Sequence, residues 1–236
     1  MSENVSGKTA GEAVGTVARG GAAASVVIAL VGGGDDGVAL LGDLVLRIAA
    51  RQGLYGMTVQ SYGPQIRGGE SASLLRLATE EIQYEGGRTD LLLCFRSSDL
   101  SRFRGSVRLH GESLVLLETT DRGALPDWAG RSERETYRFP FATFENGQEV
   151  AGSPKNMLAL GLLCRALGWP ETLAREALTE RFGHRPTLLA HDLAAFEKGF
   201  AAAGVPALPA LSARVQGLIV ESGNEAVARG AMDAGV

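Results

Sequence analysis

The pattern of apolar and polar residues predicts strands alternating with helices from about residue 24 onward. An apolar, β-branched run at Ser25–Val31 predicts a buried strand, and a helix follows it. The apolar side chains that fall on one face of this helix are Val38, Leu41, Val45 and Ile48. Further apolar runs of strand length lie at Met57–Ser61, Ser71–Ala78, Leu91–Phe95 and Leu114–Glu118.

From residue 153 the apolar period becomes helical. Ser153 and Pro154 suit N-cap and first-turn positions, and a helix is predicted from there to about Gly168. Two further helical segments are predicted at Pro170–Phe182 and Thr187–Ala203. The remaining segments read as a linker at Val205–Ala210, a strand at Val215–Val220 and a helix at Asn224–Ala234.

This order of elements predicts an α/β fold, a Rossmann-like three-layer domain with a mostly parallel sheet and a helical C-terminal part. We assign that domain to residues 24–204, a linker to 205–212 and the start of another unit to 213–236. Residues 1–23 are rich in Gly, Ala, Ser and Thr and poor in large apolar side chains, so we expect a disordered leader there.

Composition narrows the function classes. The net charge is -4, and Lys and Arg are scattered rather than clustered, which indicates no nucleic-acid partner. The apolar run at 22–31 is far shorter than the ~20 residues that span a bilayer, so no membrane partner is expected either. The two cysteines, Cys94 and Cys164, are too far apart in sequence for a Cys-x-x-Cys clamp, and a reducing cytoplasmic setting fits them.

A glycine-rich loop at residues 32–37 separates the first predicted strand from its helix. Glycines there let the backbone approach a ligand, and a helix N-terminus attracts phosphate. The loop is only a partial dinucleotide fingerprint, and Asp35 and Asp36 would repel a phosphate placed directly on it. The alternative is that Asp36 caps the helix and the glycines make a tight turn.

A second loop, residues 61–71, joins two predicted strands and contains a Gly-Pro turn, Arg67 and a glycine pair. An Arg flanked by glycines presents its guanidinium for two-point contact with a phosphate or carboxylate. The alternative is a solvated Arg on a turn whose glycines only relieve strain.

Three motifs in this order carry a resemblance to a known family. They are Gly33-Gly34-x-x-Gly37-Val38, then Tyr62-Gly63-Pro64-x-x-Arg67-Gly68-Gly69-x-Ser71, then Lys155-Asn156-Met157-Leu158-Ala159-Leu160-Gly161. Together they resemble the gamma domain of 2-oxoacid:ferredoxin oxidoreductases, particularly 2-oxoglutarate types in which gamma is fused ahead of alpha. The resemblance covers about Val27–Gly204, and Ser222–Ala231 is similar to the opening of the alpha, or pyrimidine-binding, domain.

The resemblance implies a part of an enzyme that oxidatively decarboxylates a 2-oxoacid and forms acyl-coenzyme A, and that is not catalytic alone. It implies thiamine diphosphate, Mg²⁺ and an iron-sulfur cluster in the remaining alpha and beta subunits or domains, with ferredoxin reached through the complex. The two glycine loops would face coenzyme A. The implied contact residues are Gly33, Gly34, Asp35, Asp36, Gly37, Tyr62, Arg67, Gly68, Gly69 and Ser71.

The chain departs from the family pattern at one loop, and two alternative functions remain open. Gamma domains usually read Gly-Gly-Gln-Gly where this chain has Gly34-Asp35-Asp36-Gly37, which leaves the ligand of the first loop open. Lys155, at a predicted helix start, is a weaker candidate contact, because the family keeps Asn156-Met157 more visibly than the Lys, and a solvated helix end is the favoured alternative. The alternative functions are a stand-alone nucleotide-binding module and a structural subunit without ligand.

Overall fold

The computed structural model describes residues 24–63, 69–133, 136–142, 144–145, 148–149, 154–212 and 215–236. The leader predicted at 1–23 lies outside these residues, as do Arg67 and Gly68 of the second loop.

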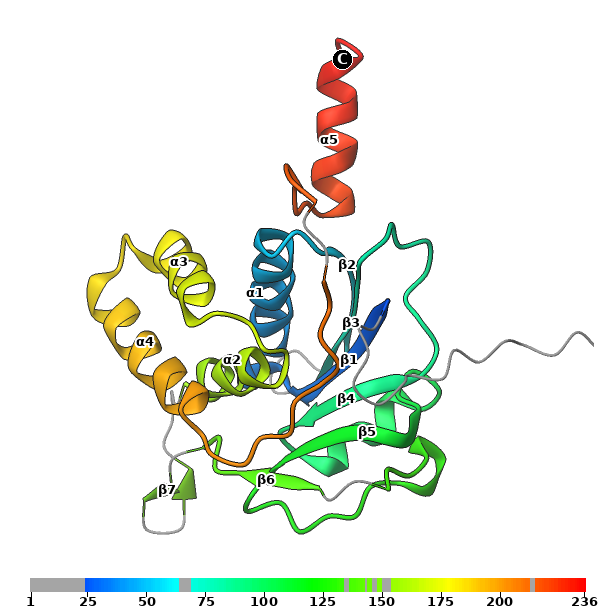
Figure 1. Cartoon of the computed structure of the whole chain (residues 1–236), viewed down its shortest axis with the longest axis vertical. Helices are drawn as coiled ribbons and strands as arrows, with labels where there is room; N and C mark the ends of the chain where they lie inside the picture. Colours follow the sequence, from blue (N-terminus) through cyan, green and yellow to red (C-terminus); the bar gives the residue numbers. More distant parts are fainter. Residues whose placement is uncertain are drawn as a thin grey trace, which may run out of the picture.

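A six-stranded sheet in the order β2-β3-β1-β4-β5-β6 forms the centre of the domain (Figure 1). Its strands are β1 (Ser25–Gly33), β2 (Tyr55–Tyr62), β3 (Glu70–Ala78), β4 (Thr89–Cys94), β5 (Leu109–Glu118) and β6 (Tyr137–Phe139). The pairs β1–β4, β4–β5 and β5–β6 are parallel, whereas β3 is antiparallel to both β1 and β2. Only β3 therefore runs against the others, and the predicted mostly parallel sheet is confirmed. A separate small pair is formed by β7 (Phe144–Glu145) and β8 (Gln148–Glu149).

Helices cover one face of the sheet, and short 3₁₀ helices and loops cover part of the other. The α-helices of the domain are α1 (Val38–Arg51), α2 (Lys155–Ala166), α3 (Glu171–Phe182) and α4 (Pro186–Phe200). The 3₁₀ helices are η1 (Gly34–Asp36), η2 (Ser97–Phe103) and η3 (Asp127–Ala129). Ile28 and Leu30 of β1 point into the core shared with the helices, and Ala29 and Val31 point into a second core with η2. Alternate residues of a strand point to opposite faces, so one apolar run serves two cores.

Two glycines let α2 and α4 pack backbone against backbone. A Cβ on Gly161 would lie 2.2 Å from the carbonyl oxygen of Phe196, and one on Gly199 would lie 2.0 Å from that of Leu158. Any side chain at either position would force the helices apart. This close packing gives a structural reason for Gly161, which ends the third motif of the sequence resemblance.

The segment predicted as a linker is packed onto the domain. Leu208 is buried, and its N–H donates to the carbonyl of Ala166 over 2.8 Å. Farther on, the N–H of Val215 donates to the carbonyl of Gly53 over 3.1 Å. The strand predicted at Val215–Val220 is wrong, because the described residues there form no strand. They line a cavity together with residues from the end of α1.

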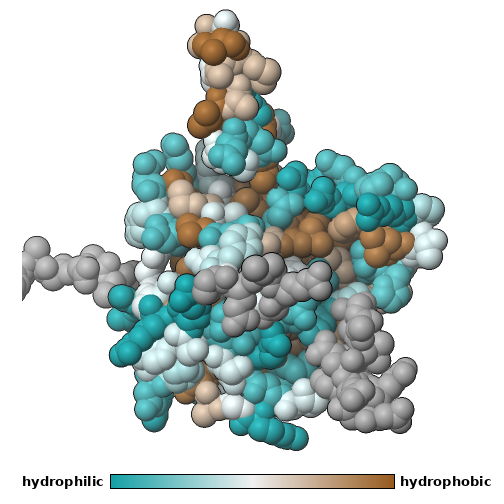
Figure 2. Space-filling view, turned by 180° about the vertical axis from the view of Figure 1, so that it is seen from behind, coloured by the Kyte–Doolittle hydropathy of each residue, from teal (hydrophilic) through white to brown (hydrophobic). Residues whose placement is uncertain are grey.

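The last helix, α5 (Gly223–Asp233), extends away from the domain (Figure 1). A capping box starts it: the Ser222 hydroxyl accepts from the Glu225 N–H, and the Glu225 carboxylate accepts from the Ser222 N–H. None of its residues is buried, and the exposed fractions of Val227 and Met232 are 74% and 70%. Figure 2 shows brown, hydrophobic atoms on the projecting helix.

We expect this exposed helix to bind an apolar-surface dye when the chain is alone. Changing Val227 and Met232 together to Lys should lower dye fluorescence severalfold, whereas Leu188→Lys on α4, which starts 37% exposed, should change it little. Equal fluorescence from the chain and its α5 variant would contradict the expectation.

Candidate functional site

The site lies where the carboxyl ends of neighbouring parallel strands diverge. After β1 the chain turns into η1 and α1, and after β4 it turns into η2. The connection from β1 leads through α1 to β2, on one side of β1 in the sheet. The connection from β4 leads through η2 to β5, on the other side, so the two connections diverge between β1 and β4. In open α/β sheets such a switch point forms the crevice that receives ligands.

The two glycine loops predicted from the sequence meet at this edge. The N–H of Gly34 donates to the carbonyl of Gly69 over 2.7 Å, and Gly33 pairs with Glu70 in the β1–β3 register. The N–H of Gly63 donates to the carbonyl of Glu70 over 2.6 Å, so both ends of the second loop lie beside the first. Residues more than thirty positions apart in the chain thus form one backbone surface.

Asp36 anchors the first loop from inside. Its residue is 3% exposed, and one carboxylate oxygen accepts the N–H of Gly33 over 2.7 Å. The other lies 2.5 Å from Nζ of Lys155 at the start of α2. A buried carboxylate needs such partners to offset its lost hydration. Both oxygens of Asp36 are therefore engaged inside the protein.

Asp35 and Arg96 form the exposed rim of the same loop. The side chain of Asp35 is 73% exposed, and its carboxylate lies 3.9 Å from Nη2 of Arg96. Nε of Arg96 donates to Asp99 over 3.0 Å. Burial lowers the pKa of Arg96, but the carboxylates of Asp99 and Asp36 more than offset this, and the net pKa is raised. The guanidinium therefore stays charged at neutral pH.

The Arg96 side chain also lies against the backbone of Gly33. A Cβ on Gly33 would lie 1.9 Å from Nη2 of Arg96, so the guanidinium occupies the space that a side chain would fill. Gly37 is constrained differently: its φ of 71° is left-handed, and a Cβ there would lie 2.4 Å from Nδ2 of Asn156. The first and third motifs of the sequence therefore interlock at the start of α1.

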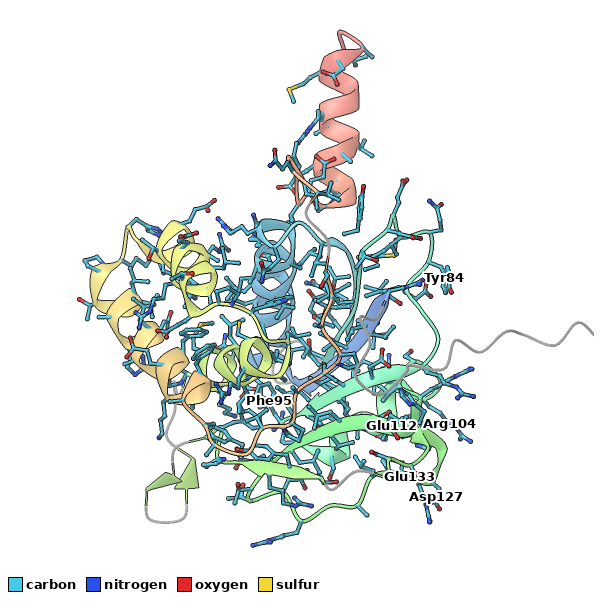
Figure 3. The ribbon with its side chains drawn as sticks, in the orientation of Figure 1. Tyr84, Phe95, Arg104, Glu112, Asp127 and Glu133 are labelled. Atoms are coloured by element: carbon cyan, nitrogen blue, oxygen red, sulfur yellow. The ribbon has the colours of Figure 1, made fainter. Side chains whose placement is uncertain are left out.

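A cavity of about 320 Å³ opens beside this loop at the ends of β4 and β5. Phe95, labelled in Figure 3 near α2, forms part of its wall and packs edge-on against Phe141 with ring centroids 5.2 Å apart. Arg96 and Lys155 also line it, as does the carboxylate of Glu118, which accepts the N–H groups of Phe141 and Ala142 over 2.8 and 3.0 Å. Charged side chains and the Phe95 ring share the wall of the cavity, and its acids already have donors inside the protein.

The remaining predicted site residues differ in accessibility. Tyr62 is 60% exposed at the end of β2, and its hydroxyl donates to Gln60. Ser71 is buried between β1 and β2, in register with Gly32 and Tyr62. Arg67 and Gly68 lie outside the described residues. The sequence analysis missed Arg96, although it directly follows the predicted buried strand Leu91–Phe95, the position where parallel strands present ligand contacts.

Redox ligands are not gathered at this edge. No group of three or more His, Cys, Asp or Glu side chains that could hold a metal occurs within the described part of the chain. Burial raises the pKa of both Cys94 and Cys164, so their thiols stay protonated. His110 lies at the other end of the strands, where its Nε2 is 3.0 Å from Asp90. Of the helices that the structure describes, none is long and apolar enough to cross a membrane.

Comparison with known proteins decides the family. Residues 27–202 match the pyruvate ferredoxin/flavodoxin oxidoreductase family. The chain belongs to this family. The gamma-type resemblance carried by the three sequence motifs is thereby confirmed.

Relatives of this family member are oxidoreductase subunits. The 2-oxoglutarate synthase subunit KorC of Methanothermobacter marburgensis is 28% identical over 153 residues, which cover 63% of this chain and 81% of that subunit. The KorC subunit of Archaeoglobus fulgidus is 31% identical over 146 residues, covering 61% and 71% of the two chains. Both relatives are thus parts of enzymes rather than complete enzymes.

Solved structures show the same fold. The 2-oxoglutarate:ferredoxin oxidoreductase of Magnetococcus marinus, solved with 2-oxoglutarate, coenzyme A and succinyl-CoA, aligns with a TM-score of 0.72 and 21% identity. That alignment covers 89% of this chain but only 37% of the Magnetococcus chain. The oxoacid ferredoxin oxidoreductase gamma subunit of Geobacter sulfurreducens aligns with a TM-score of 0.58 and 23% identity, over 75% of this chain and 95% of that subunit.

Proposed function

We propose that the chain is the gamma-type part of a 2-oxoacid:ferredoxin oxidoreductase and that its two joined glycine loops contact coenzyme A. The observation that carries the proposal is the hydrogen bond between Gly34 and Gly69 at the switch point of the sheet. It makes one backbone surface from the two motifs of the family resemblance. The bound coenzyme A in the Magnetococcus relative supports the same ligand class.

The geometry suggests a different role for each of the site residues. The N–H groups of Gly33 and Gly34 are already used by Asp36 and Gly69, so neither glycine donates to the coenzyme. Arg96 lies over Gly33, and we infer that Gly34 is the glycine of this loop that allows close approach. Arg67, between the described Gly63 and Gly69, is proposed as the phosphate contact, with Gly68 and Gly69 beside it. Asp35 is exposed and suits donors such as ribose hydroxyls or the adenine amine.

Asp36 and Lys155 are proposed to hold the loop instead of touching the ligand. Their ion pair is 1% and 13% exposed on the two side chains, which leaves little of Asp36 for solvent or coenzyme. The charge of Asp36 is offset by Lys155, and the carboxylate of Asp35 lies 3.9 Å from the guanidinium of Arg96. The double acid of the first loop therefore repels a phosphate less than the sequence alone suggests.

The domain division is also proposed. We infer that residues 24–204 are the gamma-type domain and that 213–236 begin an alpha, pyrimidine-binding domain. The match of a free gamma subunit to 75% of this chain, and of a longer relative to 89%, supports that division. We propose that the partner alpha and beta subunits or domains hold thiamine diphosphate, Mg²⁺ and the iron-sulfur cluster and dock ferredoxin. We also propose that the substrate is 2-oxoglutarate and that the complex is cytoplasmic.

Purification of the native complex through a tag on this chain tests the function. We expect co-purifying subunits that carry iron and thiamine diphosphate, and ferredoxin reduction that requires both 2-oxoglutarate and coenzyme A. A chain that purifies alone and binds a free nucleotide would favour the stand-alone module. A complex whose activity is independent of this chain's loops would favour a structural subunit.

The chain by itself is expected to be colourless, because its thiols are buried and protonated and four thiolates are needed for a cluster. Visible absorption and metal analysis of the pure chain measure this. A bound flavin, iron or thiamine diphosphate in stoichiometric amount would contradict it.

A further inference from the structure

The Arg96 side chain reaches from the end of β4 to the first glycine loop, residues 32–37. The backbone just before it is tied to β1, because the Phe95 N–H donates to the carbonyl of Val31 over 2.9 Å. Nη2 of Arg96 lies against Gly33, at 1.9 Å from the place that a Cβ would take. The side chain is 50% exposed, so it lies over the loop without being enclosed. It thus spans the switch point between β1 and β4.

Three carboxylates from two segments hold the guanidinium in this place. Asp99, in η2, accepts from Nε over 3.0 Å and ties the side chain to the end of its own strand. Asp35 and Asp36, in the loop, lie 3.9 and 3.8 Å from Nη2. The guanidinium is a rigid planar fork, so its two ends cannot move independently. A shift of the loop away from β4 would therefore separate both loop carboxylates from Arg96, which Asp99 keeps at the strand end.

The charge balance favours this holding role over direct contact with a coenzyme phosphate. The ion pairs described at this edge join two cationic side chains, Arg96 and Lys155, to three carboxylates, those of Asp35, Asp36 and Asp99. A phosphate brought to Arg96 would compete with carboxylates that are already in place, and it would meet a net negative charge. The guanidinium is better suited to fixing the loop than to binding an anion.

We propose that Arg96 is a positioning residue for coenzyme capture: it holds the first glycine loop against the end of β4, and the loop, not Arg96, contacts the coenzyme. This role rests on the proposed function, in which the joined loops contact coenzyme A. A loop that is free to leave β4 would be in the binding geometry for only part of the time. The apparent affinity for the coenzyme falls by that fraction.

Kinetics and hydrogen exchange on the assembled complex test the proposal together. Arg96→Ala should raise the Michaelis constant for coenzyme A by about tenfold, as expected for a loop in the binding geometry a tenth of the time. Without coenzyme, the hydrogen-bonded N–H groups of Gly33 and Gly34 should exchange severalfold faster. Carbon dioxide release and the urea midpoint should change little, because half-exposed ion pairs contribute little to stability.

Arg138→Ala is the matched control. Arg138 is an exposed arginine on β6 whose Nη1 donates to the carbonyls of Glu118 and Asp121 at the same end of the sheet. Its loss should leave both the Michaelis constant and the exchange of the glycine amides unchanged, because it holds a different loop. Arg96→Lys should recover only part of the Arg96→Ala effect, since an ammonium cannot contact Asp99 and the loop carboxylates with one planar group.

A second variant displaces Arg96 without removing it. Gly33 has a φ of −76° and a ψ of 162°, extended backbone that alanine adopts without strain. Gly33→Ala should therefore push the guanidinium off the loop and raise the Michaelis constant as Arg96→Ala does. The double variant should be no worse than either single variant, because both act through the same contact. Multiplied effects in the double variant would show separate causes and overturn the proposal.

Two further results overturn the positioning role and leave the proposed function standing. A raised Michaelis constant with unchanged amide exchange in Arg96→Ala would make Arg96 a direct coenzyme contact. Faster exchange with an unchanged Michaelis constant, while Arg67→Ala still raises it, would make the position of the first loop irrelevant to capture. If neither Arg96→Ala nor Arg67→Ala alters the coenzyme A dependence, the proposed function fails, and the positioning role fails with it.

Discussion

Replacing Asp36 by Ala is expected to destabilise the folded chain by about 3 kcal/mol, because removing one member of a buried ion pair leaves the other charge poorly compensated. Nζ of Lys155 lies 2.5 Å from the Asp36 carboxylate, and only 13% of the Lys155 side chain is exposed. The change also removes the acceptor for the Gly33 N–H. Urea unfolding of the full chain, with the slope checked for constancy, measures the effect.

Neighbouring variants separate the buried carboxylate from the acidic loop in general. Asp35→Ala removes an adjacent carboxylate whose side chain is 73% exposed, and it should change stability by less than about 0.5 kcal/mol. Asp36→Asn keeps an acceptor for Gly33 but loses the charge, so its cost should lie between the two. If Asp36→Ala were as mild as Asp35→Ala, the carboxylate would not hold the loop, and a direct ligand role would gain support.

Local pattern predicted the fold well where one segment decides its own structure. The apolar run at Ser25–Val31 and the helical stripe from Val38 became β1 and α1 with nearly the predicted bounds. The pattern failed at Val215–Val220, where the residues are apolar enough for a strand but form no strand with the rest of the described chain. Strand formation depends on partners, which a local pattern does not contain.

At the candidate site, too, local features were predictable from the sequence and long-range contacts were not. The sequence predicted close backbone approach at Gly33, Gly34 and Gly69, and the structure brings Gly34 against Gly69, whereas contact of these glycines with coenzyme A stays a prediction. The Asp36–Lys155 pair joins residues 119 positions apart. Only the fold shows that this carboxylate turns inward. Arg96 was missed because one Arg after an apolar run resembles any solvated strand end until its guanidinium is seen over Gly33.

Replacing Arg67 by Ala is expected to raise the Michaelis constant for coenzyme A by roughly ten- to a hundredfold in the assembled enzyme. Hydrogen bonds to charged groups contribute ~1.5–3 kcal/mol, and ~1.4 kcal/mol corresponds to one decade in affinity. The described ends of its loop, Gly63 and Gly69, lie beside the first glycine loop, which supports placing Arg67 near the coenzyme. Decarboxylation should survive, because thiamine chemistry is proposed for the partner.

Steady-state kinetics with varied coenzyme A, alongside carbon dioxide release, measure both parts of this expectation. Arg67→Lys should recover only part of the loss, since an ammonium cannot make a planar two-point contact. Arg104→Ala is the matched control: this exposed arginine, labelled in Figure 3, lies near the beginning of β5, at the other end of the strands, and its loss should leave the Michaelis constant unchanged. Unchanged coenzyme A dependence in Arg67→Ala, with lower stability or weaker subunit association, would instead make Arg67 a turn or interface residue.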